Sequence, residues 1–479
     1  MPPQESPATS SETENAYSVA VSRTRSLINA VIAVIGLLIS AVTGFTTDAP
    51  TLWGLLPIVL YAVLALAGMD IVVATVIALL SGLLMLQTPP TEVGTILGDS
   101  MGETITIIGV IIMLGAGVGE VLKQTGVATT IVRGIMRLVG ERSQFAVTLG
   151  VMLASGVLVA SLGTLAGAIA ISAPIILPIA ARMGFTKSAT ASMLFLGGCA
   201  GLAMAPFAGS NVAIMEAAEV GYLQYVIYGG GPLALLSLAI GPFIVQWRQS
   251  RTAKEDDYYA SDEFADEESE TPPHTRAATI AFTVALVVTV AYAIWTAAGT
   301  SFPLLALPII GIATAVAGRL SAAETLTYMY RGAAKLISIF ILFWLLAGLF
   351  LMIDMLAPFD VILENYGDSL AEGSPFVFAI LVALLGWVGV PGATAAQVIL
   401  LDEVFGPLGA SMGVTAASWV IVMLFASKAD TYGPFPNANM IGVMGLARST
   451  NLRNMLITGW ALLVPATLMY LVILFFQNQ

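Results

Sequence analysis

The stretch PFAGSN, Pro206–Asn211, recurs in altered form as PFPNAN, Pro434–Asn439. Each stretch carries proline and asparagine between long apolar runs. Proline removes a backbone donor and interrupts a helix. Inside a bilayer an interrupted helix is tolerated only where it is buried in protein or lines a water-filled cavity. Two such breaks, about half the chain apart, predict a duplicated membrane fold with a working site at the breaks.

Composition places the chain in a membrane. Of its 479 residues 58% are hydrophobic and 10% are charged, and the mean hydropathy is +0.92. A soluble domain carries about 25% charged residues. The net charge of −12 gives no indication of a nucleic-acid partner. A single cysteine, Cys199, and a single histidine, His274, exclude disulfide frameworks and Cys/His metal clusters, so we expect no cofactor.

Apolar runs of helical, bilayer-spanning length predict an all-α polytopic membrane protein with about 11 transmembrane helices. The predicted crossings are Ser26–Phe45, Leu52–Leu66, Ile71–Leu86, Thr104–Leu122, Ala189–Met204, Leu223–Trp247, Ala278–Thr296, Pro303–Ala317, Leu336–Met355, Ala416–Ala429 and Met455–Phe476. Two further apolar regions are interrupted by SLGT and GVPGAT, and each predicts a re-entrant hairpin with its tip at mid-membrane.

The domain boundaries follow from these segments. The predicted units are a disordered cytoplasmic tail at 1–25, a first transmembrane helix at 26–51, repeat 1 at 52–247, an acidic cytoplasmic loop at 248–277 and repeat 2 at 278–479. Repeat 1 contains a hairpin at 143–182 and a broken helix at 186–221. Repeat 2 contains a hairpin at 373–411 and a broken helix at 414–445.

Charge asymmetry supports this topology. With the N-terminus inside and each hairpin returning to its own side, all but one of the eighteen Lys and Arg residues are cytoplasmic, as the positive-inside rule requires. The exception is Lys428. The C-terminus is then predicted outside.

An internal match supports the duplication. An offset of 229 positions pairs Gly163 with Gly392 and Pro178 with Pro407, and an offset of 228 pairs Asn211 with Asn439. Each unit holds five crossings, an odd number, so the two copies are inverted relative to each other. Inverted repeats with interrupted helices are the pattern of secondary transporters.

The segment GAGVGEVLKQTGVATTIVRGIMRLVGERSQFAV, Gly115–Val147, resembles the first-repeat signature of the gluconate permease (GntP) family. The element GATAAQVI, Gly392–Ile399, resembles the second hairpin of that family. The resemblance implies the plan of the ion transporter superfamily, in which two inverted repeats each carry a hairpin and a broken helix. The first hairpin tip, SLGTLAG, differs from the usual tip of the gluconate permease family, and the Ser-Asn-Thr sodium motifs of the superfamily's divalent-anion branch are absent.

The hairpin tips are candidate anion sites, because a helix N-terminus presents free N–H groups and partial positive charge. The predicted substrate-binding residues at the tips are Ser161, Gly163, Thr164, Gly392 and Thr394. Helix packing is the alternative role of such small residues.

The breaks supply the other candidates. Asn211, Asn437 and Asn439 are predicted to bind substrate, and Ser210 and Thr431 to take part in ion coupling. Asn211 and Asn439 are also candidate sodium ligands, and the alternative is a kink satisfied by neighbouring helices.

Lys428 and Asp430 are the sharpest feature. A lysine deep in a membrane costs at least ~3 kcal/mol and requires a partner. Lys428 is predicted to be the counter-charge for a bound organic anion, with Asp430 as the proton acceptor. A structural ion pair is the alternative, as is an ammonium that occupies a sodium site.

The remaining intramembrane acids carry weaker expectations. Glu216 and Glu219 are expected at the outer interface, Glu120 in a local ion pair with Lys123, and Asp402 on the outward side with gating as a less favoured role.

These observations predict a secondary active transporter, not an enzyme, that moves a small organic anion such as a carboxylate or sugar acid across the bacterial inner membrane. The resemblance implies proton coupling and an elevator-type homodimer. The alternatives are sodium coupling, a sodium/proton antiporter, a TRAP-type membrane subunit with a binding protein, and, with least support, a membrane enzyme.

Overall fold

A computed structural model describes residues 23–140, 142–255, 257–260, 272–296, 298–299, 301–371, 373–387, 394–433 and 435–477. Side chains are outside this description at residues 23–25, 363, 366–371, 428–430 and 438. The described chain is all-helical and contains no strand, only an isolated bridge between Thr186 and Tyr258. The predicted all-α membrane fold is thereby confirmed.

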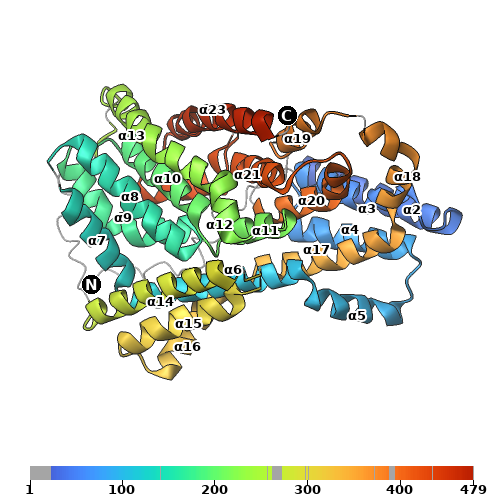
Figure 1. Cartoon of the computed structure of the whole chain (residues 1–479), viewed down its shortest axis with the longest axis horizontal. Helices are drawn as coiled ribbons and strands as arrows, with labels where there is room; N and C mark the ends of the chain where they lie inside the picture. The colour runs from blue at the N-terminus through green and yellow to red at the C-terminus, as the bar shows by residue number, and fades with distance from the viewer. Residues whose placement is uncertain are drawn as a thin grey trace, which may run out of the picture.

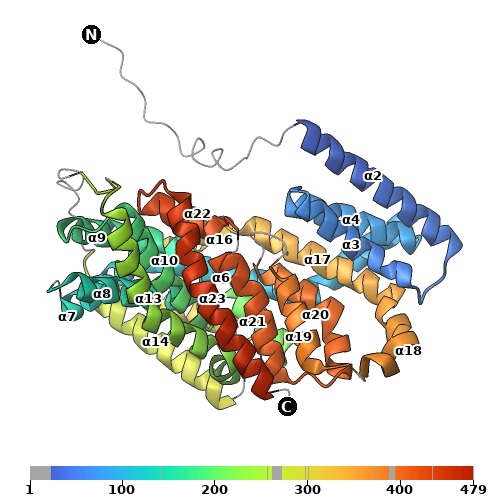
Figure 2. The same ribbon diagram turned by 90° about the horizontal axis from the view of Figure 1, so that it is seen from above.

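The first half of the chain begins with a peripheral helix, α2 (Arg23–Thr46), which lies at the edge of the molecule beside α3 and α4 (Figure 2). The helices that follow are η2 (Leu52–Leu55), α3 (Leu56–Leu66), α4 (Ile71–Met85), α5 (Pro90–Asp99), η3 (Ser100–Gly102), α6 (Thr104–Gln124), α7 (Val127–Val139), α8 (Gln144–Leu162), α9 (Leu165–Arg182), α10 (Lys187–Met204), α11 (Gly209–Ala217), α12 (Tyr222–Tyr225), η4 (Val226–Gly230) and α13 (Gly231–Thr252).

The second half repeats this order of helices. It contains α14 (Thr275–Thr296), α15 (Pro303–Ala317), α16 (Ala322–Ala334), α17 (Ile337–Leu356), α18 (Pro358–Ala371), α19 (Pro375–Leu385), α20 (Thr394–Ser411), α21 (Ala416–Tyr432), α22 (Ala438–Leu446) and α23 (Leu452–Gln477). Helix α6 corresponds to α17, α8–α9 to α19–α20, and α10–α11 to α21–α22.

Packing between the halves is reciprocal. Helix α11 packs on α20, and its counterpart α22 packs on α9. Likewise α6 packs on α15, and its counterpart α17 packs on α4, while α6 and α17 contact each other. In Figure 1 α2–α5 and α18 lie at one end, α7–α9 at the other, and the broken helices between them. Reciprocal contacts of this kind are what a pseudo-two-fold arrangement of two repeats requires.

The helices follow the predicted spans closely. In the described part of the chain eight helices are long and apolar enough to cross a membrane, or nine if the bent pair α10–α11 is one span. Four predicted crossings, α3, α4, α15 and α21, have close to the predicted bounds and are shorter than these eight helices. The hairpin arms α8 and α9 have 19 and 18 residues, so each is as long as a crossing.

The structure adds helices that hydropathy did not predict: α5, α7, α16 and α18. Helix α7 is strongly amphipathic, and it buries Val127, Ala128, Val132 and Met136 on one face. An amphipathic helix has one apolar face and one polar face. Its hydropathy averaged along the sequence is therefore low, and a search for apolar runs does not detect it. Ser321 and Glu324 form a capping box that starts α16.

Close backbone packing sets the position of α10, whose residues 188–203 are all buried. Helices α8 and α10 meet at Gly156, Gly197 and Gly201. A Cβ at Gly201 would lie 2.0 Å from the Gly156 carbonyl oxygen. Small residues permit this approach, which is the usual solution where membrane helices pack tightly.

We therefore expect Gly201→Ala to destabilise the protein by about 1–3 kcal/mol, because the new methyl group has only backbone to displace. Gly94→Ala is the matched control, since no atom lies within 4 Å of its added Cβ. Reversible unfolding in detergent measures both variants. Equal stability of the two variants would contradict the close α8–α10 contact.

Candidate functional site: two helix breaks and their acidic surroundings

The first break separates α10 from α11, which are bent by 40°. The side chain of Asn211 is fully buried, and its Nδ2 donates to the Leu202 oxygen at 2.7 Å and to the Ala205 oxygen at 2.8 Å. Pro206 cannot supply a backbone donor here. The Asn211 amide therefore replaces donors that the helix break removed, which was the alternative to ligand binding for this residue.

The second break separates α21 from α22. Asn437 caps α22, because its Oδ1 accepts from the Met440 N–H at 2.9 Å. Its Nδ2 donates to the Thr431 oxygen at 3.1 Å. Asn437 thus joins the end of one half-helix to the start of the next.

The sequence offset pairs Asn211 with Asn439, but the structure gives the bridging task in the second repeat to Asn437. Asn439 is half-buried, two residues farther into α22. The second connection spans residues 433–437 and the first spans 205–208, so a different position reaches the open carbonyls. Asn439 is therefore the counterpart of Asn211 in the sequence offset, but Asn437 makes the bridging hydrogen bonds.

The first hairpin tip lies against the first break. Gly163 ends α8 in the left-handed region, with φ of 67°, and Thr164 precedes α9. A Cβ at Gly163 would lie 3.2 Å from the Ala208 Cα, so the tip and the break are in direct contact. The Ser161 hydroxyl donates to the Val157 oxygen of its own helix at 2.7 Å. Ser210 lies beside Asn211, with its Oγ 3.5 Å from Oδ1.

The second hairpin tip, including Gly392, is outside the described residues, and Thr394 begins α20 beside it. Sequence reasoning missed Gln397, which is buried one turn into α20. Its Nε2 donates to the Gly386 oxygen at 2.6 Å and contacts the Ala426 oxygen at 3.4 Å. Gln397 therefore ties both arms of the hairpin to α21. The sequence does contain a signal for this residue, because Gln397 is a single glutamine within an apolar hairpin segment.

Repeat 2 contains three buried polar atoms without a hydrogen-bond partner in the described chain, on α20, on α21 and just after α19. Among the described residues the buried Gln397 Oε1, Thr431 Oγ1 and Trp387 Nε1 have no hydrogen-bond partner. Gln397 and Thr431 are 2% and 1% exposed. Buried polar groups are normally satisfied, so unsatisfied ones call for a ligand, an ion or water. The side chains of Lys428 and Asp430, on the same helix as Thr431, are outside the described residues.

Two acidic cavities lie beside α11, and the first of them adjoins the first break. One has a volume of about 600 Å³ and is lined by Pro206, Phe207, Glu216 and Glu219, among others. The other has a volume of about 450 Å³, and its lining includes Glu219 and Asp402. None of the described lining residues of either cavity is Lys or Arg. Both cavities therefore favour cations over anions.

Asp402 lies on the hairpin arm α20 and accepts a hydrogen bond from the Trp419 Nε1 at 2.7 Å. Its neighbour Glu403 is partly exposed on the same helix. That both acids lie on the outward side of the membrane stays a prediction.

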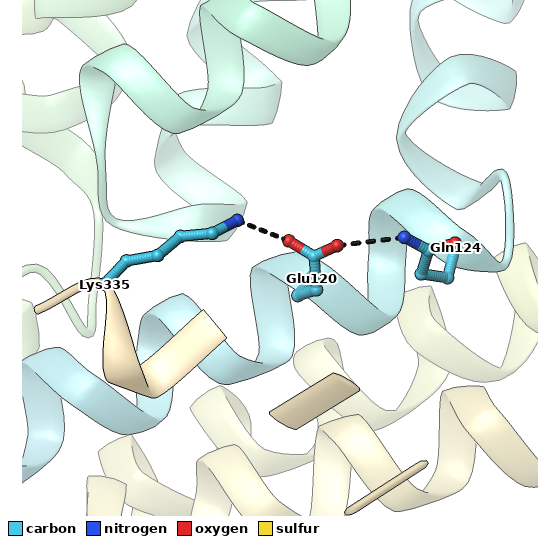
Figure 3. Close-up of polar contacts among 3 residues, drawn as sticks. All are labelled: Glu120, Gln124 and Lys335. Atoms are coloured by element: carbon cyan, nitrogen blue, oxygen red, sulfur yellow. Dashed lines mark hydrogen bonds and ion pairs between the residues drawn. The ribbon is translucent and has the colours of Figure 1, made fainter. Parts of the chain in front are cut away.

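The predicted partner of Glu120 was wrong. Figure 3 shows Glu120 between Lys335 and Gln124. Lys335 Nζ lies 2.7 Å from Glu120 Oε2, and Gln124 Nε2 donates to Oε1 at 2.9 Å. Lys335 precedes α17, so the ion pair connects the central helices of the two repeats. A local pairing with Lys123 overlooked this contact across 215 positions.

Comparison with known proteins also indicates a membrane transporter. Residues 6–244 match a family model described as "Na+/H+ antiporter family". The chain is a multi-pass membrane transporter. More specifically, the match and the fold support a secondary transporter. No curated protein sequence matches the chain.

A solved structure, the YdaH transporter of Alcanivorax borkumensis, described as having an unusual topology, resembles this transporter with a TM-score of 0.56. The match covers 94% of this chain and 97% of that one at 16% identity. At this identity the likeness concerns the fold alone.

Removing the amide at the first break should destabilise the transporter. We expect Asn211→Ala to cost about 1–3 kcal/mol, because two buried carbonyls lose their shorter hydrogen bonds and keep only backbone donors at 3.4 and 3.5 Å. The control is Asn365→Ala, since Asn365 is exposed and bonds only within its own helix, to the Val361 oxygen. Thermal unfolding in detergent measures the difference. Similar melting of both variants would show that the Asn211 amide does not hold the break.

Proposed function

We propose that this transporter exchanges sodium ions for protons. The observation that carries the proposal is the charge of the two cavities, whose described linings contain Glu216, Glu219 and Asp402 and no basic residue. Carboxylates in a low-dielectric cavity concentrate cations and repel anions. The match of residues 6–244 to the antiporter family supports the same function.

The second hairpin and break supply the proposed ion site. Sodium is a hard cation, and hard cations prefer oxygen ligands. Gln397 Oε1 and Thr431 Oγ1 are buried oxygens without partners among the described residues. Thr431 lies in the last turn of α21, next to the connection between α21 and α22. We assign these two side chains to sodium, and the adjacent Asp430 to the exchanged proton.

Transport of a small organic anion, with proton or sodium coupling, is the second candidate. It rests on the resemblance of Gly115–Val147 to gluconate permeases and on Lys428 as counter-charge. The bacterial inner membrane, the cytoplasmic N-terminus and a homodimer remain proposals with either function. A TRAP-type subunit would require a binding protein.

A transport assay with the reconstituted protein distinguishes the two functions. Proteoliposomes that hold an acid-interior pH gradient and a pH-sensitive dye should lose the gradient when NaCl is added, and keep it with choline chloride. If sodium has no effect and a sugar acid such as gluconate drives the pH change, the transporter carries organic anions. In that case Lys428→Ala should abolish the response.

The ion site makes a sharper prediction. Thr431→Val keeps the shape of the side chain and removes one ligand oxygen, so the sodium concentration for half-maximal exchange should rise about tenfold, equivalent to ~1.4 kcal/mol. Thr327→Val is the control, because Thr327 is exposed on α16 and bonds only to the Ala323 oxygen of that helix. An unchanged sodium dependence in Thr431→Val would remove Thr431 from the site.

A further inference from the structure

The segment that follows α13 lies across the ends of two other helices. Of this segment Glu255 and residues 257–260 are described, and we call these residues the strap. An isolated antiparallel bridge pairs Tyr258 of the strap with Thr186, the N-cap of α10. Helix α10 packs on α13, α22 and α23, and these helices lie together in Figure 2. Helices α10 and α22 belong to the broken helices of different repeats, so the strap lies where the two repeats meet.

The strap satisfies the start of α10. The first N–H groups of a helix have no acceptor inside the helix, and they favour a negative charge. The backbone oxygen of Asp257 accepts from the Lys187 N–H at 2.7 Å, and its Oδ2 accepts from the Ser188 N–H at 2.8 Å. Asp257 therefore caps α10 from a distant part of the chain, in addition to the local cap by Thr186.

The strap also satisfies the end of α22. The last carbonyl groups of a helix have no donor inside the helix. The Tyr259 hydroxyl donates to the oxygen of Ala447, the C-cap of α22, at 2.9 Å. Lys187 Nζ of α10 lies 5.7 Å from the centroid of the Tyr259 ring, which is a cation–π distance. Asp257 and Tyr259, two residues apart, thus connect the start of α10 to the end of α22.

A buried polar junction anchors the strap to α13 and α23. Arg248 Nη1 donates to Asn454 Oδ1 at 3.0 Å, and Asn454 Nδ2 donates to Glu255 Oε2 at 3.3 Å and to Ser188 Oγ at 3.2 Å. Arg248 is 3% exposed, and its Nε and Nη2 have no hydrogen-bond partner in the described chain. A buried positive charge that is incompletely paired attracts carboxylates. The acidic residues Glu255 and Asp257 are therefore suited to this position.

We propose that the strap couples the two broken helices, so that the start of α10 and the end of α22 shift together during transport. A displacement of α10 acts on Asp257, and Tyr259 transmits it to α22. Because each of these helices adjoins one break, a change at one break then reaches the other. This coupling goes beyond the proposed sodium/proton exchange, since it requires no particular transported ion.

Hydrogen exchange, measured by mass spectrometry on the purified protein in nanodiscs, tests the coupling, because it reports local opening of each helix end. Asp257→Ala removes the side-chain cap of α10. The start of α10 should then exchange about fivefold faster, since a cap contributes ~1 kcal/mol. The coupling predicts that exchange also accelerates at the end of α22, which Asp257 does not bond.

Tyr259→Phe makes the reciprocal test, and it changes only one hydroxyl group. This variant removes the donor to Ala447, so exchange should accelerate at the end of α22 and, through the strap, at the start of α10. Helix α8 also packs on α10, but it has no bond to the strap among the described residues. Exchange in α8 should therefore stay at the wild-type rate in both variants.

Two variants elsewhere in the chain serve as matched controls. Asp70 caps α4 by accepting from the Val72 and Val73 N–H groups at 3.0 and 3.1 Å, so Asp70→Ala should change exchange in α4 and leave α10 and α22 unchanged. Tyr330→Phe, at an exposed tyrosine of α16, should leave all of these helix ends at the wild-type rate. The proposal is overturned if each strap variant affects only the helix end that it bonds, or if α8 accelerates by the same factor as α10 and α22.

The exchange measurement uses no sodium gradient, so its outcome is independent of the transport assay. Acceleration at both helix ends, in a protein without sodium-driven proton movement, would retain the coupling and reject the antiporter. Sodium-driven proton movement, with each strap variant affecting one helix end alone, would do the opposite.

Discussion

A carbonyl oxygen freed by a helix break has no water to bond inside a membrane, so a side chain must supply the missing donor. In this transporter the amides of Asn211 and Asn437 do so, one at each break. The rest of the site depends on this arrangement. With the carbonyls held, α11 can rest on α20 and α22 on α9, and the first hairpin tip can contact Ala208. Asn211 and Asn437 thus hold the breaks together, and their role in substrate binding stays a prediction.

The two repeats use the same helix order for different chemistry. Around the first break the contacts are tight and largely apolar, with Gly156, Gly197 and Gly201 packed backbone to backbone. Around the second, Gln397 bridges the hairpin to α21, and oxygens of Gln397 and Thr431 are left without a partner in the described chain. The two halves thus share an order of helices and differ in the polar groups beside their breaks. The acidic cavities beside α11 favour a cation over an anion.

Sequence reasoning succeeded where a local physical rule operates. Proline and glycine located the breaks after Met204 and Tyr432 and the tip at Gly163, because these residues act on their own backbone. It failed where the partner is distant in the chain. Nothing local in the sequence indicates that Glu120 pairs with Lys335, or that Asn437 takes the role of Asn211. Amphipathic α7 was missed because its apolar residues occupy only one face.

The claim that a buried oxygen site binds sodium in exchange for a proton is tested most directly by proton release from the purified transporter. In weakly buffered detergent solution, added NaCl should acidify the medium by a saturable amount proportional to the protein. Choline chloride should not, and Thr431→Val should shift the saturation to higher sodium. No acidification with sodium, together with proton uptake or release on adding an organic acid, would contradict the account.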